Sequence, residues 1–80
     1  MDKKLAVVSI IVSDLNAVES VNCILHDYAE FIIGRMGIPY REKSVFVINV
    51  VIDAPQDKIS GLSGKLGMVK GVQSKVLTTK

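Results

Sequence analysis

Two short apolar stretches decide the fold, and they read LAVVSIIV at residues 5–12 and SVFVINVVI at residues 44–52. Both are rich in β-branched residues and too short for a typical helix, so each predicts a β-strand. An antiparallel sheet with one solvated face normally alternates apolar and polar side chains. Here one face of each strand is apolar, and on the other face the only polar residues are Ser9, Ser13 and Asn49. The pattern therefore predicts two central strands that are covered on both sides.

The residues after the first strand predict a helix and then an edge strand. Ser13 or Asp14 offers an N-cap oxygen, and apolar residues at helical spacing predict an amphipathic helix from about residue 15 to 28 or slightly beyond. Residues 32–40 are the next predicted strand. Pro39 cannot donate a hydrogen bond to a neighbouring strand, so we place this strand at an edge of the sheet.

A second helix and a last strand are predicted after the strand at 44–52, which a hairpin turn at 41–43 precedes. Asp53-Ala54-Pro55 is the predicted helix start, because proline is tolerated in the first turn. The apolar stripe of this helix consists of Ile59, Leu62, Leu66 and Val69. Gly67 and Gly71 end it, and residues 72–78 are the predicted final strand.

This order of elements is βαββαβ, the split arrangement of ferredoxin-like α+β domains. Right-handed crossovers place both helices on one face of a four-stranded antiparallel sheet with strand order 4-1-3-2. There is no linker or internal repeat, so residues 1–80 are predicted to form a single domain.

Two helices leave the other face of this sheet bare, although that face is apolar. Contiguous exposed apolar surface usually marks an interaction site. The chain is therefore predicted to associate with itself as a dimer or tetramer, although an open face that merely tolerates valines is the alternative. The predicted interface consists of Leu5, Val7, Ile11, Val45, Val47 and Val51.

Composition excludes several classes of function. No apolar run reaches the roughly 18 to 20 residues of a spanning helix, so no membrane association is expected. The lone Cys23 excludes an internal disulfide framework and fits a reducing compartment, which predicts a cytoplasmic protein. Residues 58–80 hold five lysines and no acid, but the lysines are five to seven positions apart. This spacing favours a solvated surface over direct nucleic-acid binding.

No constellation of residues predicts catalysis, and no cofactor is indicated. The sequence shows no Ser-His-Asp set that spacing singles out and no carboxylate pair expected to be buried. We therefore expect a protein that is not an enzyme.

The strongest candidate for a ligand site is the second helix. Gly61 and Gly64 lie in its interior, away from the apolar stripe, and Lys65 flanks them. A helix face without side chains lets a ligand or another backbone approach closely, and a short, frayed helix is the alternative explanation. Arg35 and Arg41 could hold a carboxylate or phosphate, although arginines on edge strands also oppose aggregation.

Cys23 and His26 are one helical turn apart and are weak candidates for binding a soft metal ion. One cysteine and one histidine cannot complete a closed site within one chain. A solvated acidic helix face is the simpler interpretation, and a site shared between subunits is the alternative.

Three segments carry a resemblance to a known family: RMGIPYRE at residues 35–42, DKISGLSGKLG at residues 57–67, and Gly71-Val72. They resemble the small ACT-like proteins described as regulators of the iron-only hydrogenase system, and the similarity covers essentially the whole chain. It implies a ferredoxin-like fold, dimers or higher oligomers, and a likeness to the ligand-binding domain of nickel-responsive repressors.

Two departures limit what this resemblance implies. The nickel repressors bind metal through several histidines and a cysteine, whereas this chain has only His26 and Cys23, so nickel is not implied. They also carry a separate DNA-binding domain, for which 80 residues leave no room. A transcriptional role would therefore need a partner protein that binds DNA or acts in hydrogenase maturation.

Together these observations predict a homo-oligomeric regulatory domain that senses a small ligand at a subunit interface. One alternative is a structural or protein-interaction module without a ligand. Another is a metal-linked sensor that uses Cys23 and His26.

Overall fold

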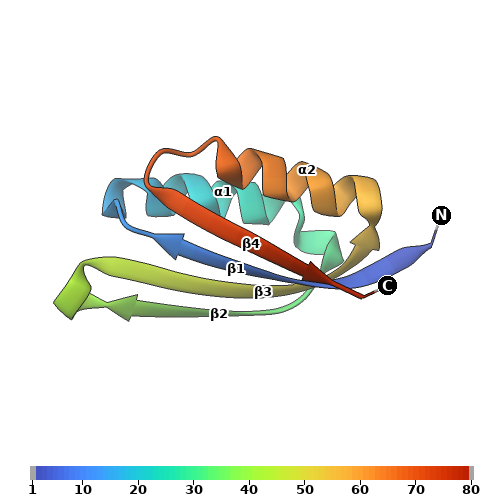
Figure 1. Cartoon of the computed structure of the whole chain (residues 1–80), viewed down its shortest axis with the longest axis horizontal. Helices are drawn as coiled ribbons and strands as arrows, with labels where there is room; N and C mark the ends of the chain where they lie inside the picture. Colours follow the sequence, from blue (N-terminus) through green and yellow to red (C-terminus); the bar gives the residue numbers. More distant parts are fainter. Residues whose placement is uncertain (1, 80) are drawn as a thin grey trace.

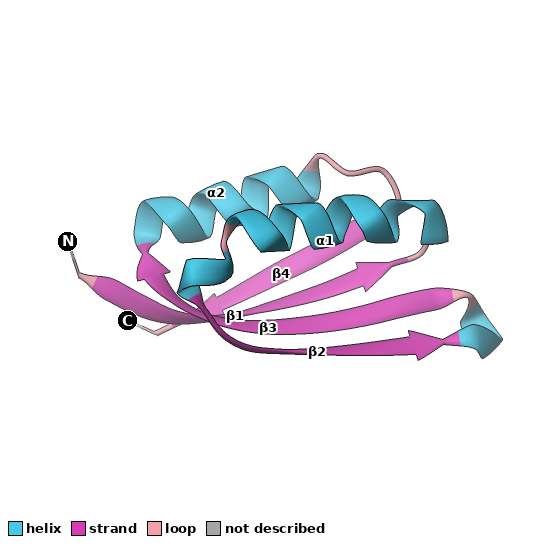
Figure 2. Ribbon diagram, turned by 180° about the vertical axis from the view of Figure 1, so that it is seen from behind, coloured by secondary structure: helices cyan, strands magenta, loops and turns pink. Residues whose placement is uncertain are grey.

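The computed structural model describes residues 2–79, which form one antiparallel sheet with both helices on the same face (Figures 1 and 2). In chain order the elements are β1 (Lys3–Val12), η1 (Leu15–Ala17), α1 (Val18–Asp27), η2 (Ala29–Phe31), β2 (Ile32–Tyr40), η3 (Arg41–Lys43), β3 (Val45–Pro55), α2 (Gln56–Gly67) and β4 (Val72–Thr78). The strands are ordered β2-β3-β1-β4. This is the predicted order read from the other edge, so the ferredoxin-like α+β fold is confirmed.

The core lies between the sheet and the helices. It takes alternate residues of β1 and β3, because successive side chains of a strand point to opposite faces. Against them pack Val21 and Leu25 of α1 and Ile59, Leu62 and Leu66 of α2, all of them at most 2% exposed. No polar or charged side chain is buried between residues 2 and 79.

The predicted start of the second helix is wrong by about three residues. Asp53, Ala54 and Pro55 continue β3, where Ala54 is buried and lies opposite Lys4 of β1. Pairing with these residues also starts β1 at Lys3, two positions before the predicted strand. Pro55 keeps an extended backbone and precedes the helix as its N-cap residue.

The other boundaries agree closely with the sequence. Asp14 is the N-terminal cap, and its carboxylate accepts a hydrogen bond from the Asn16 backbone N–H at 3.0 Å. The helical segment begins there with a single 3-10 turn and continues as α1 to Asp27. β2 and β4 have the predicted bounds. No helix among residues 2–79 is long and apolar enough to cross a membrane.

Gly71 joins the turn before β4 to the turn after β1. Its φ angle is +84°, a left-handed conformation that side chains other than glycine's disfavour. A Cβ atom on Gly71 would lie 2.5 Å from the Cβ of Asp14. The Gly71 carbonyl accepts a hydrogen bond from the Ser13 backbone N–H at 2.8 Å. Glycine is therefore required here by both conformation and space.

We predict opposite effects for alanine at two glycines. Gly71→Ala should lower the free energy of unfolding by at least about 1–2 kcal/mol, because of the left-handed backbone and the clash with Asp14. Gly64→Ala should raise it by about 1 kcal/mol, since Gly64 lies inside α2 with nothing within 4 Å of the added atom. Urea unfolding of both variants measures the difference, and equal effects would contradict this account of Gly71.

Candidate functional site

The sheet face turned away from the helices, called the open face below, carries apolar side chains on all four strands, although on β4 it also carries Gln73 and Lys75. Strand register assigns its residues, because directly paired residues share a face. Ile38 of β2 pairs with Val47 of β3, which pairs with Ile11 of β1. The apolar residues of the open face are Leu5, Val7, Ile11, Met36, Ile38, Tyr40, Val45, Val47, Val51 and Leu77. All six residues of the predicted interface are among them.

Between residues 35 and 40, the edge strand β2 places its apolar side chains on the open face and its other residues on the helix side. Its apolar side chains Met36, Ile38 and Tyr40 point away from the helices and are 43–54% exposed. Its helix-side positions hold Arg35, Gly37 and Pro39. These three apolar residues were not among those predicted for the interface, because Pro39 and the arginines indicated a polar edge strand. Their alternation at positions 36, 38 and 40 was the available signal.

One polar pair interrupts the open face at its centre. Ser9 of β1 and Asn49 of β3 lie directly opposite each other. The Ser9 hydroxyl donates a hydrogen bond to Oδ1 of Asn49 at 2.8 Å. The neighbouring open-face positions along both strands are apolar, whereas across the sheet Ser9 also lies opposite Lys75 of β4. The pair therefore belongs to a short polar row that crosses an otherwise apolar part of the face.

In the helix layer, Gly61 contacts α1 rather than facing outward as predicted. A Cβ atom on Gly61 would lie 2.9 Å from the hydroxyl oxygen of Tyr28, the residue that ends α1. Tyr28 is only 8% exposed, and the Lys65 ammonium lies 5.1 Å from the centre of its ring. Such a distance allows a cation–π attraction. Tyr28 was not singled out from the sequence, although it follows the apolar stripe of its helix.

Gly64 lies on a different side of α2, where the predicted free space does exist. It is exposed and lines a shallow groove between α2 and β4. The groove is lined by Gln56, Ile59, Ser60, Ser63, Gly64, Val76 and Thr78. Its lining is largely small and polar, and the Gln56 amide donates a hydrogen bond to the Ser60 hydroxyl at 3.0 Å.

The predicted ligand residues are not gathered at one place within the chain. Arg35 extends from β2 toward α1, where its guanidinium donates a hydrogen bond to Oδ1 of Asn22 at 2.8 Å. Arg41 lies in the η3 turn, which projects from one end of the molecule (Figure 1). Gly61, Gly64 and Lys65 lie on α2. A site that uses all five residues would therefore have to combine more than one copy.

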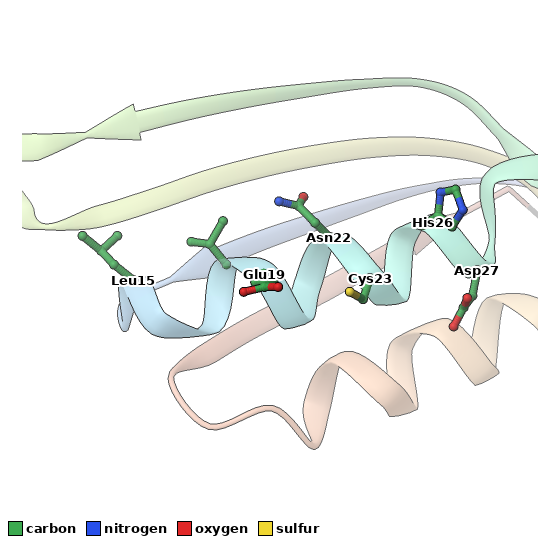
Figure 3. A pocket seen from close by; sticks show the side chains of 7 residues that line it. Leu15, Glu19, Asn22, Cys23, His26 and Asp27 are labelled. Carbon is green, nitrogen blue, oxygen red and sulfur yellow. The ribbon is translucent and has the colours of Figure 1, made fainter.

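A second groove follows the outer side of α1 (Figure 3) and includes both candidate metal ligands. It is lined by Leu15, Val18, Glu19, Asn22, Cys23, His26 and Asp27. Figure 3 shows His26 and Asp27 pointing to opposite sides of the helix. Within residues 2–79, no group of three or more His, Cys, Asp or Glu side chains could hold a metal ion.

The fold is that of an ACT domain. The ACT domain of GTP pyrophosphokinase from Chlorobium tepidum is 26% identical, with a TM-score of 0.69 over 96% of this chain and 99% of that one. A formyltetrahydrofolate deformylase from Pseudomonas putida KT2440 shares the fold at 14% identity, with a TM-score of 0.65 over 90% of this chain and 28% of the enzyme chain.

A more similar structure is that of the uncharacterized protein TM1266 from Thermotoga maritima. It is 36% identical and has a TM-score of 0.94 over 99% of this chain and 100% of that one. The family model described as "TM1266-like: Iron-only hydrogenase system regulator, putative" matches residues 4–76. The chain belongs to this family, which confirms the resemblance found in the sequence. No curated protein matches it.

We predict that the tolerance of Gly61 for a side chain depends on Tyr28. Gly61→Ala should destabilise the domain relative to Gly64→Ala by about 1–3 kcal/mol, because the new methyl group overpacks against the Tyr28 hydroxyl. In a Tyr28→Phe background the next nearest ring atom is 4.0 Å away, so the same substitution should become stabilising. A double-mutant cycle by urea unfolding measures this coupling, and additive effects would show that the contact is not formed.

Proposed function

We propose that the chain is a cytoplasmic, non-enzymatic regulatory domain that works as a homo-oligomer and senses a small ligand at a subunit interface. Membership of the regulator family and the ACT fold support the regulatory class. The apolar open face is the observation that carries the proposal, because an ordinary monomer does not leave such a surface in water.

The size of the open face suits a stable interface. Four strands about 4.8 Å apart with roughly nine residues each, at about 3.4 Å per residue, give a flat projection of roughly 600 Å². Specific interfaces bury about 800 Å² per partner. Protruding side chains such as Met36, Ile38 and Leu77 make the accessible area of the open face larger than its flat projection. The area of the face is therefore of the same order as that buried in a specific interface.

The chemistry of the open face suits a second copy of the chain. Its charged side chains lie at the margins: Lys3 and Asp53 at one end of β1 and β3, and Lys75 on the edge strand β4. A twofold interface brings the same patch of both copies together, so a charged centre would repel itself. An uncharged centre with marginal charges avoids this repulsion.

The ligand is proposed to be a small anion, held through Lys65 beside the space at Gly64. Arg35 and Arg41 would complete such a site from a neighbouring copy, because they lie on other elements within one chain. Ligand binding between copies would link ligand concentration to assembly. A transcriptional or hydrogenase-linked output would then pass through a partner protein.

We predict that the wild-type chain sediments at no less than twice its mass of 8.7 kDa at micromolar concentration. Ile11→Lys should dissociate it into folded monomers, because the new ammonium would be buried against its copy. Met68→Lys is the matched control: Met68 is 86% exposed at the end of α2, away from the open face, and should leave assembly unchanged. A wild-type monomer would overturn the proposed assembly.

We also predict that a small anion raises the melting temperature. Phosphate, nucleotides and amino acids are the probes, and a ligand at a hundredfold excess over its Kd stabilises by about 2.7 kcal/mol, or about 10 °C or more for a domain of this size. Lys65→Met should abolish the shift, whereas Lys58→Met, an exposed position on the same helix, should retain it. No shift with any probe would leave a structural module without a ligand.

A further inference from the structure

The polar pair at the centre of the open face differs from the apolar residues that precede and follow it on the same strands. Ser9 and Asn49 occupy the two central strands, and the next open-face positions on either side are paired apolar residues: Val7 with Val51, and Ile11 with Val47. A valine at both positions would make the middle of the two central strands uniformly apolar on this face. The pair therefore distinguishes the centre of these two strands from the positions before and after it, and Lys75 of the edge strand β4 lies beside Ser9 in the same row.

The internal hydrogen bond satisfies only part of this pair. Oδ1 of Asn49 accepts the Ser9 hydroxyl proton at 2.8 Å. The Asn49 amide also has two N–H donors, which have no hydrogen-bond partner within residues 2–79 and are left to water. The Ser9 oxygen keeps free acceptor capacity. If the open face is covered, an apolar partner surface at this point would strand these donors, which costs free energy.

A second copy can supply the missing acceptors when its polar pair lies in the same row across the sheets. A twofold axis that lies between the two sheets and passes over the pair places four polar side chains together. If the axis runs along the strands, Ser9 meets the partner's Asn49. If it runs across them, Asn49 meets the partner's Asn49. In both arrangements an amide N–H can donate to an oxygen of the other copy.

A slip along the strands separates the pairs. A slip by one pleat repeat moves the copies about 6.8 Å and places the Asn49 amides of both copies opposite valine or isoleucine, because the rows on either side pair Val7 with Val51 and Ile11 with Val47. A slip by one strand keeps each amide over the same row, which continues to Lys75 on one side and Met36 on the other. The apolar residues alone would tolerate such slips, because valines pack on valines in many alignments. A buried asparagine fixes the register of coiled coils by the same physical principle.

We infer that the Ser9–Asn49 pair sets the register along the strands of two copies packed through their open faces, an inference that rests on the proposed self-association. The apolar residues of the face supply the attraction, and the polar pair selects one alignment along the strands among those that the attraction permits. The pair thus gives specificity to the assembly and contributes little to its affinity.

Cys23 makes this inference testable without a new labelling site. It is the one cysteine of the chain, is exposed, and lies on α1, on the side of the sheet opposite the open face. A spin label on Cys23 reports the distance between copies across two helix layers and the interface. Layer spacings of about 10 Å place the two labels roughly 30 Å or more apart, which pulsed electron resonance can measure.

The experiment compares the label-to-label distances of the wild type with those of Ser9→Ala/Asn49→Val. The wild-type pair should give one narrow distance. The double variant should sediment as a dimer at least as stable, while its distances split or broaden as slipped registers become populated. Asn49→Val alone should behave in the same way. Val51→Ala is the control: it weakens the apolar contact, keeps the polar pair, and should keep the single narrow distance at concentrations where the dimer forms.

The outcomes separate the two proposals. If the double variant remains a dimer with the wild-type distance, the inference about register is overturned and self-association stands. If the wild type gives no distance between labels and sediments as a monomer, both are overturned. Splitting in Val51→Ala as well would also contradict the inference, because any loss of apolar packing would then loosen the register.

Discussion

The constraint on which this structure depends is a mismatch between its sheet and its helices. Four strands expose two faces, and α1 and α2 can cover only one of them. In β1 and β3 both faces are nevertheless apolar, and the edge strand β2 turns Met36, Ile38 and Tyr40 to the uncovered side. The core of the single chain therefore explains why one face of the sheet is apolar. The proposed pairing of copies explains why the other face is apolar as well.

The same constraint orders the rest of the molecule. The two helices pack directly against each other, because Tyr28 at the end of α1 fills the space beside Gly61 of α2. Lys65 of α2 lies over the tyrosine ring. What remains accessible there is the groove beside Gly64 between α2 and β4. The open face, proposed for assembly, and the groove, proposed for a ligand, thus lie on opposite sides of the sheet. A ligand held between copies would therefore need a further contact between copies on the helix side.

The fold could be predicted from the sequence because each strand and helix has a clear local pattern. The β-branched strands and amphipathic helices follow one another in the order βαββαβ, which is typical of one topology. The start of α2 could not, because Pro55 suits both a strand end and a helix start, and pairing of Ala54 with Lys4 decides between them. The contact of Gly61 with Tyr28 depends on how two helices pack, which spacing on one helix does not reveal. Strand alternation alone assigns the six valine, leucine and isoleucine residues of the predicted interface to one face. Met36, Ile38 and Tyr40 alternate in the same way, but only the register of β2 shows that they share the open face.

The central claim is that the open face of one copy covers that of another, and nuclear Overhauser effects between copies test it most directly. In a mixture of isotope-labelled and unlabelled chains, filtered spectra report only contacts across the interface. The account predicts such contacts for the methyl groups of Ile11, Val47 and Val51, and none for the core residues Leu25 and Leu62, which the helices enclose. Contacts confined to the helix side, or none at all in folded protein, would contradict it.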